Sequence, residues 1–112
     1  MADFQTVCKL ADLKPGEGKT VQVAGQLVAL FLVDGRVYAI DDVCPHMGAS
    51  LGAGLVEGDA VTCPWHAWRF RVTDGTWLNS PRVKIPCYAA RVVGGDVQVR
   101  PPDPRPAPGA TP

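Results

Sequence analysis

The sequence predicts an all-β fold made of small antiparallel sheets. Short apolar runs recur along the chain with turn residues between them, and the 112 residues include 12 glycines and 11 prolines. No segment sustains the 3.6-residue periodicity of an amphipathic helix. The length fits one domain with a modest core, predicted to span residues 1–100.

The predicted strands follow one another through recognisable turns. Asp34-Gly35 lies between two apolar runs, which is a strong hairpin signal. Asp74-Gly75 and Gly94-Gly95 mark two further turns, and Gly25 breaks one apolar segment. The strands are expected at 4–9, 20–24, 26–33, 36–41, 60–63, 68–73, 76–78, 88–93 and 96–100.

Charge and hydropathy exclude several classes of partner. Eleven lysines and arginines balance eleven acids, so no basic excess favours nucleic acid or an anionic membrane. The longest apolar stretch, 27–33, is far too short to span a bilayer, and the N-terminus does not resemble a secretory signal. We therefore expect a soluble, cytoplasmic protein.

The chain changes character after residue 100. Half of residues 101–112 are prolines, and this segment lacks apolar anchors. Such a composition predicts an extended, solvated tail. A docking role for this tail is the alternative.

Two short Cys/His pairs carry the chemical signal. Cys44 and His46 form a Cys-x-His pair, Cys63 and His66 form a Cys-x-x-His pair, and residues 47–62 separate them. A proline directly follows each cysteine and fixes its own φ, which stiffens each loop. Thiolate and imidazole are ligands for a transition metal, so the four side chains predict a metal centre.

Two metal groups accept two cysteines and two histidines. One is structural zinc, and the other is a [2Fe–2S] cluster in which histidines replace two thiolates on one iron. Zinc fingers usually place like ligands together, whereas each pair here is mixed. The mixed pairs favour the iron–sulfur interpretation, with a zinc-stabilised interaction module as the alternative.

The segment 63–70, Cys-Pro-Trp-His-Ala-Trp-Arg-Phe, together with the turn at 73–75, resembles the Rieske family. The resemblance covers nearly the whole chain up to Arg100. It implies that Cys44 and Cys63 hold one iron of a single [2Fe–2S] cluster and that His46 and His66 hold the other. It also implies a Rieske fold with a cluster-binding subdomain at about 42–81.

The resemblance further implies an electron carrier. Its partners would be a reductase and an acceptor enzyme such as an aromatic-ring oxygenase. A small subunit of an assimilatory nitrite reductase is the alternative. The sequence shows no substrate pocket or nucleophile constellation, which favours a carrier or complex component over a catalyst acting alone.

Departures from the high-potential respiratory members predict a low potential. Those members carry an extra cysteine in each loop, where Ala49 and Trp65 stand here, so the corresponding disulfide cannot form. They also carry a serine and a tyrosine that donate to sulfur, where Trp68 and Phe70 stand. Because hydrogen bonds to sulfur favour the reduced cluster, their loss lowers the potential.

Several other residues are expected to contribute to docking or to packing. Met47, Trp65 and Pro81 are expected to form an uncharged rim beside the histidines. Cys8 and Cys87 lie in apolar, strand-like contexts, which favours small buried residues over a disulfide or a reactive thiol. Four basic residues form either a docking patch or a solvated strand face: Arg69, Arg71, Arg82 and Lys84.

Overall fold

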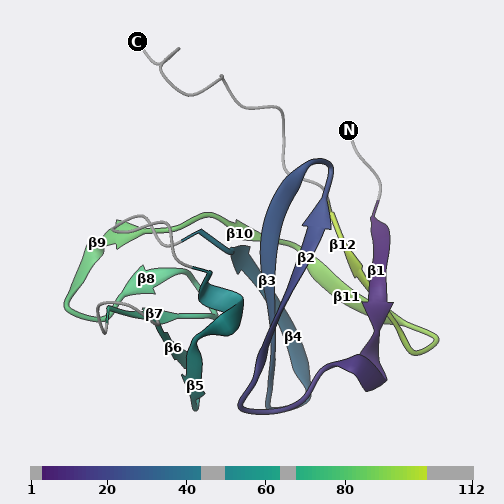
Figure 1. The fold of residues 1–112 in the computed structure, drawn as a ribbon, viewed down its shortest axis with the longest axis horizontal. Helices are drawn as coiled ribbons and strands as arrows, with labels where there is room; N and C mark the ends of the chain where they lie inside the picture. The colour runs from purple at the N-terminus through teal and green to yellow at the C-terminus, as the bar shows by residue number, and fades with distance from the viewer. Residues whose placement is uncertain (1–3, 44–49, 64–67, 101–112) are drawn as a thin grey trace, which may run out of the picture.

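The computed structural model describes residues 4–43, 50–63 and 68–100. Within these residues the chain forms three antiparallel sheets and two short 3₁₀-helices, η1 (Leu10–Asp12) and η2 (Leu51–Ala53) (Figure 1). No helix in this part of the chain is long and apolar enough to cross a membrane. The prediction of an all-β fold is confirmed.

The first sheet joins the start of the chain to its last hairpin. Its order is β1-β12-β11, with the strands β1 (Gln5–Lys9), β11 (Ala90–Val93) and β12 (Asp96–Val99). The guanidinium carbons of Arg91 and Arg100 lie 4.1 and 5.0 Å from the centre of the Phe4 ring. These cation–π contacts fasten the residue before β1 to the hairpin.

The second sheet lies between the other two (Figure 1). Two of its connections are tight turns with positive φ at both central residues, Ala24-Gly25 (50° and 82°) and Asp34-Gly35 (51° and 77°). Such angles match the right-handed twist of a hairpin. The sheet order is β10-β4-β3-β2, with β2 (Gly18–Val23), β3 (Gln26–Val33), β4 (Arg36–Asp41) and β10 (Cys87–Tyr88).

The third sheet follows the segment that carries the first Cys/His pair. Its order is β5-β6-β7-β8-β9, so consecutive strands are neighbours throughout. Pro81 lies in β9, an edge strand, where a missing backbone N–H is tolerated. The strands are β5 (Leu55–Glu57), β6 (Ala60–Thr62), β7 (Arg69–Arg71), β8 (Thr76–Trp77) and β9 (Ser80–Lys84).

Strand β3 supplies both hydrophobic clusters of the domain. Ala29 and Phe31 point into a cluster shared with the third sheet, and Val28 and Leu30 point into one shared with the first sheet. All four side chains are fully buried. A strand covered on both faces explains the continuous apolar run that the sequence shows here.

The structure differs from the sequence-based prediction at three strands. Strands β5 and β9 were not predicted, because β5 is only three residues long and the edge strand β9 is mostly polar. The expected strand 88–93 is two strands: Tyr88 pairs with Ala39 in β4, whereas Ala90 pairs with Val99 in β12. The chain passes from the second sheet to the first between them, a change that local sequence does not encode.

Gly75 offers a test of the packing between β7, β8 and β9. It is buried, adopts φ +78°, and a β-carbon added there would collide with the carbonyl oxygen of Ile85 and lie 3.0 Å from the sulfur of Cys87. We expect Gly75→Ala to lower the free energy of unfolding by about 3 kcal/mol, through left-handed strain plus overpacking.

The matched control is Gly16→Ala, because Gly16 has φ +85° with nothing near its missing β-carbon. This variant should cost only the strain, about 1 kcal/mol. Urea denaturation of both variants measures the difference. Equal losses would show that the approach of Ile85 carries no energetic cost.

Candidate metal centre

The second Cys/His pair begins where β6 ends. Cys63 follows β6 directly and is 1% exposed. Its N–H donates a 2.7 Å hydrogen bond to the carbonyl of Trp68, and Thr62 pairs with Arg69 across the hairpin. The β6–β7 hairpin therefore fixes both ends of the segment 64–67, which contains His66 and lies outside the described residues.

The segment with the first pair is closed at its base in the same way. Val43 and Ser50 form an isolated antiparallel bridge, and the N–H of Leu51 donates to the carbonyl of Asp42 at 2.6 Å. Cys44 and His46 lie between these anchor points, outside the described residues. Both predicted ligand segments thus begin and end at hydrogen-bonded positions.

A buried carboxylate, that of Asp42, holds together the two ends of the segment that carries Cys44 and His46. Asp42 is 2% exposed, and its Oδ1 accepts hydrogen bonds from Thr20 Oγ1 (2.9 Å), Ser50 Oγ (2.9 Å) and the N–H of Gly52 (2.8 Å). The donors come from β2, from the residue before η2 and from η2 itself. A buried charge is expensive unless it is hydrogen-bonded, and three donors meet that need here.

The neighbouring glycine makes this arrangement possible. A β-carbon at Gly52 would collide with Thr20 Oγ1 and lie 2.9 Å from Asp42 Oδ1. A larger residue would therefore push apart the donors that surround the carboxylate. No sequence motif indicates the roles of Asp42, Thr20 and Gly52, because no local pattern joins residues 22 positions apart.

The carboxylate of Asp41, the residue before Asp42, is hydrogen-bonded to a different part of the domain. The Tyr88 hydroxyl donates to Asp41 Oδ1 and also lies 3.3 Å from Gln26 Oε1. The N–H of Asp41 donates to the carbonyl of Pro86 at 3.0 Å. Asp41 and Asp42 consequently tie the end of β4 to two different parts of the domain just before Cys44.

Aromatic rings pack beside the end of the β6–β7 hairpin that carries segment 64–67. The rings of Trp68 and Trp77 stack with centroids 4.0 Å apart and planes 9° apart. Both pack against the buried cluster that contains Cys63 and Phe70. These two partly buried tryptophans therefore cover one edge of the core cluster. Trp65 and Met47 of the expected rim lie outside the described residues.

The remaining cysteines differ from one another. Cys8 is half-buried and packs against the cluster that β3 shares with the first sheet, so the prediction of a buried residue is met in part. Cys87 is exposed, which contradicts the prediction of a buried residue. Partial burial of each sulfur nevertheless raises the pKa of both thiols, which favours the neutral, less reactive form. Cys8, Cys63 and Cys87 form no disulfide with one another.

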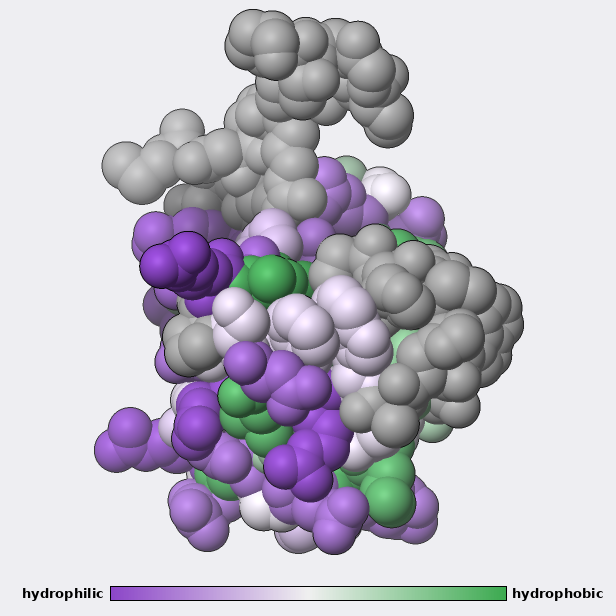
Figure 2. All heavy atoms as spheres, turned by 90° about the vertical axis from the view of Figure 1, so that its left-hand side faces the viewer, coloured by the Kyte–Doolittle hydropathy of each residue, from purple (hydrophilic) through white to green (hydrophobic). Residues whose placement is uncertain are grey.

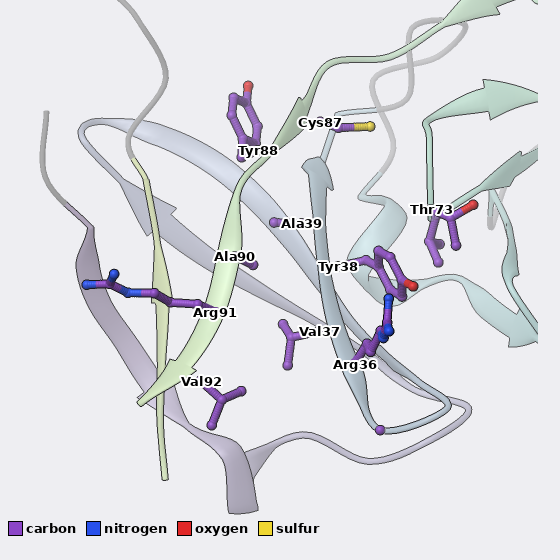
Figure 3. A pocket seen from close by; sticks show the side chains of 12 residues that line it. Arg36, Val37, Tyr38, Ala39, Thr73, Cys87, Tyr88, Ala90, Arg91 and Val92 are labelled. Atoms are coloured by element: carbon purple, nitrogen blue, oxygen red, sulfur yellow. The ribbon is translucent and has the colours of Figure 1, made fainter. Parts of the chain in front are cut away.

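A groove of about 460 Å³ lies along strands β4, β10 and β11 (Figure 3). Its walls include the side chains of Val37, Ala39, Ala90 and Val92, and Cys87 lies at one end. The Cys87 thiol contacts the carbonyl of Ile85 at 3.8 Å, and burial raises its pKa. Nothing in this lining prepares a nucleophile, so the groove offers no catalytic constellation.

The described part of the centre fits a thiolate-bound metal group. Cys63 presents one buried sulfur at the end of a paired hairpin, and both ligand segments start from fixed positions. Such a shielded thiol suits a soft metal ligand. Among the described residues no group of three or more His, Cys, Asp or Glu could hold a metal, and the other three predicted ligands lie outside them.

Comparison with known proteins identifies relatives of the chain. Residues 3–89 match the family model of the Rieske [2Fe-2S] domain. The chain is 38% identical over 101 residues to the 3-phenylpropionate/cinnamic acid dioxygenase ferredoxin subunit of Escherichia coli K12, covering 88% of this chain and 94% of that protein. It also matches cholesterol 7-desaturases of Xenopus laevis and Drosophila melanogaster, but spans only 18% of their length.

Solved structures give the same result. The carbazole 1,9a-dioxygenase ferredoxin from Nocardioides aromaticivorans superposes with a TM-score of 0.82 at 31% identity, over 88% of this chain and 98% of that one. A small subunit assigned to an NADH-dependent nitrite reductase from Mycobacterium tuberculosis superposes with a TM-score of 0.81 at 36% identity, over 88% and 95%.

The Asp42 carboxylate can be tested by stability. We expect Asp42→Ala to lower the free energy of unfolding by about 3 kcal/mol, because the variant loses three hydrogen bonds to the carboxylate and leaves the buried N–H of Gly52 without this acceptor. Asp42→Asn, which keeps an acceptor oxygen, should lose less. Urea denaturation measures both, and amide exchange at Leu51 and Gly52 reports whether the base of the segment opens.

Asp59→Ala provides the control, since Asp59 makes an exposed 3.0 Å ion pair with Arg71. Removing such a pair costs at most about 1 kcal/mol. If Asp42→Ala were no more destabilising than Asp59→Ala, the carboxylate would not hold the base of this segment.

Proposed function

The chain belongs to the Rieske [2Fe–2S] family, and on that premise we propose that Cys44, His46, Cys63 and His66 hold its one cluster. The buried Cys63, at the end of the β6–β7 hairpin, is the described residue that supports this ligand set. The two thiolates would bind one iron and the two imidazoles the other. The family match favours this set over the zinc alternative.

The function supported best is one-electron transfer between a reductase and an acceptor enzyme. When bound, the cluster supplies reversible one-electron redox chemistry. The residues of the chain contribute shielding and placement. Cys63 and Phe70 are buried in one hydrophobic cluster, and the stacked Trp68 and Trp77 pack against it. This packing excludes water from the side of Cys63 that faces the protein interior. The match along 94% of a ferredoxin subunit carries this proposal.

The acceptor we propose is an oxygenase of the kind served by the matched ferredoxins. The superposition on the nitrite reductase small subunit, at 36% identity, favours an assimilatory nitrite reductase as the second candidate. We place the protein in the cytoplasm in either case. Fold and family alone do not choose between these partners, whereas electron transfer to each purified enzyme does.

Ligand variants test the centre. We expect Cys63→Ala and His66→Ala to lose the cluster, because each removes a ligand and metal binding is coupled to folding. Iron and acid-labile sulfide assays, with electron paramagnetic resonance of the dithionite-reduced protein, measure the loss. Bound zinc without sulfide in the wild-type protein would instead establish the zinc module.

Cys87→Ala is the matched control, since it removes an exposed cysteine far from the predicted ligands in sequence. It should retain the full iron and sulfide content and the spectrum of the wild-type protein. A complete cluster in Cys63→Ala, or its loss in Cys87→Ala, would show that the ligand set is wrong.

The redox potential tests the interpretation of Trp68 and Phe70. Without hydroxyl donors at these positions, the midpoint should fall near the low end of the family range, roughly −150 mV and not +300 mV. Phe70→Tyr should raise it if the new hydroxyl reaches a ligand sulfur. Protein-film voltammetry decides, and a wild-type midpoint above about +100 mV would contradict the argument.

A further inference from the structure

Four basic side chains project from one face of the third sheet. Phe70 and Trp77 are paired across β7 and β8, and both point into the core. Alternation therefore turns Arg69 and Arg71 to the outer face of β7. In β9, Val83 packs inward, so Arg82 and Lys84 also point outward, and all four are exposed. Figure 2 views the molecule from the side of β9 and shows hydrophilic side chains over much of it.

Carboxylates neutralise only one end of this face. Asp59, in the β5–β6 turn, pairs with Arg71 at 3.0 Å. In the β7–β8 turn, hydrogen bonds from Thr76 lower the pKa of Asp74, and Arg71 and Lys84 lower it further. Both turns lie at the end of the sheet remote from Cys63. Arg71 and Lys84 thus have acidic neighbours.

Arg69 and Arg82 have no such neighbours among the described residues. No ion pair or side-chain hydrogen bond engages either guanidinium within this part of the chain. Arg69 directly follows Trp68, whose carbonyl closes the base of segment 64–67. The two strands that carry these arginines are separated by β8, so their axes lie about 10 Å apart. Neither predicted ligand segment, 44–49 or 64–67, contains an acid.

Basic residues elsewhere are engaged or dispersed. Lys9 pairs with Asp96 at 3.0 Å, and Arg91 and Arg100 lie over the Phe4 ring. Among the described residues, Arg69 and Arg82 are thus two cations without an acidic partner on one face of the third sheet, and Arg69 lies beside the second ligand segment.

We propose that Arg69 and Arg82 form a docking surface for an acidic face of a redox partner protein, an inference that rests on the proposed electron-transfer function. Two cations on a chain of zero net charge are too few for a phosphate backbone, which is bound through many contacts. They suffice to orient a protein partner, because local charge complementarity raises association rates and fixes the approach. A partner bound there would meet the protein beside segment 64–67.

The test uses a strongly acidic bacterial flavodoxin as the probe. In stopped flow, its two-electron-reduced flavin is oxidised by one electron and the oxidised protein is reduced by one. We expect the wild-type rate to fall as salt is added. The double variant Arg69→Glu/Arg82→Glu should be about tenfold slower at low ionic strength and lose most of the salt dependence.

Two controls separate local from overall charge. Lys14→Glu makes the same charge change as either single substitution, Arg69→Glu or Arg82→Glu, at an exposed position between β1 and β2, and it should stay within about twofold of the wild-type rate. Reduction of basic cytochrome c by the reduced double variant should be unchanged or faster. An unaltered flavodoxin rate in the double variant, or an equal loss in Lys14→Glu, would overturn the proposal.

Calorimetric titration of oxidised flavodoxin supplies a readout that needs no electron transfer. Weaker binding by the double variant supports the docking surface, and equal binding overturns it. Random-sequence DNA is the second titrant, and DNA binding that matches flavodoxin binding would show a non-specific anion site instead. A wild-type protein that lacks a cluster but still binds flavodoxin through these arginines would refute the proposed function and leave the docking surface standing.

Discussion

The buried carboxylate of Asp42 is the interaction on which the arrangement around the predicted centre depends. It gathers Thr20 from β2, Ser50 and Gly52 around one oxygen and fixes the segment that carries Cys44 and His46 at both ends. A hydrogen bond to a charged group contributes about 1.5–3 kcal/mol, whereas an exposed ion pair contributes about 1 kcal/mol or less. This buried network therefore contributes more to the stability of the fold than the surface ion pairs do.

Sequence patterns predicted much of the fold because they report local chemistry. Asp34-Gly35 adopts the angles of a hairpin turn, and the apolar run of β3 is buried on both faces. The passage from β10 to β11 was not predicted, since it depends on which distant strands, β4 and β12, are free to pair. The strand β5 is only three residues long, which is too short to show an alternating pattern.

In the candidate site, too, local motifs were predictable from sequence and contacts between distant residues were not. The ligand prediction depends on spacing within a few residues, which a sequence displays directly. Asp42 and Gly52 gain their roles from Thr20, which is distant in sequence and meets them only because β2 packs against η2. Cys87 was predicted to be buried from its apolar neighbours, but it lies on the short strand β10, where Ile85 before it takes the core position.

The residues next to the second ligand segment, 64–67, differ on its two sides: packed apolar side chains face the interior, and basic side chains face solvent. Toward the interior, Cys63 and Phe70 belong to one buried cluster, and the stacked, partly buried tryptophans pack against it, so this side is closely packed. Toward solvent, Arg69 begins a face whose carboxylates all lie at the remote end. A carrier must release each partner quickly, and a few exposed charges favour encounter over retention because salt screens them. The same hairpin that buries Cys63 thereby turns Arg69 outward, since alternate residues of a strand face opposite sides.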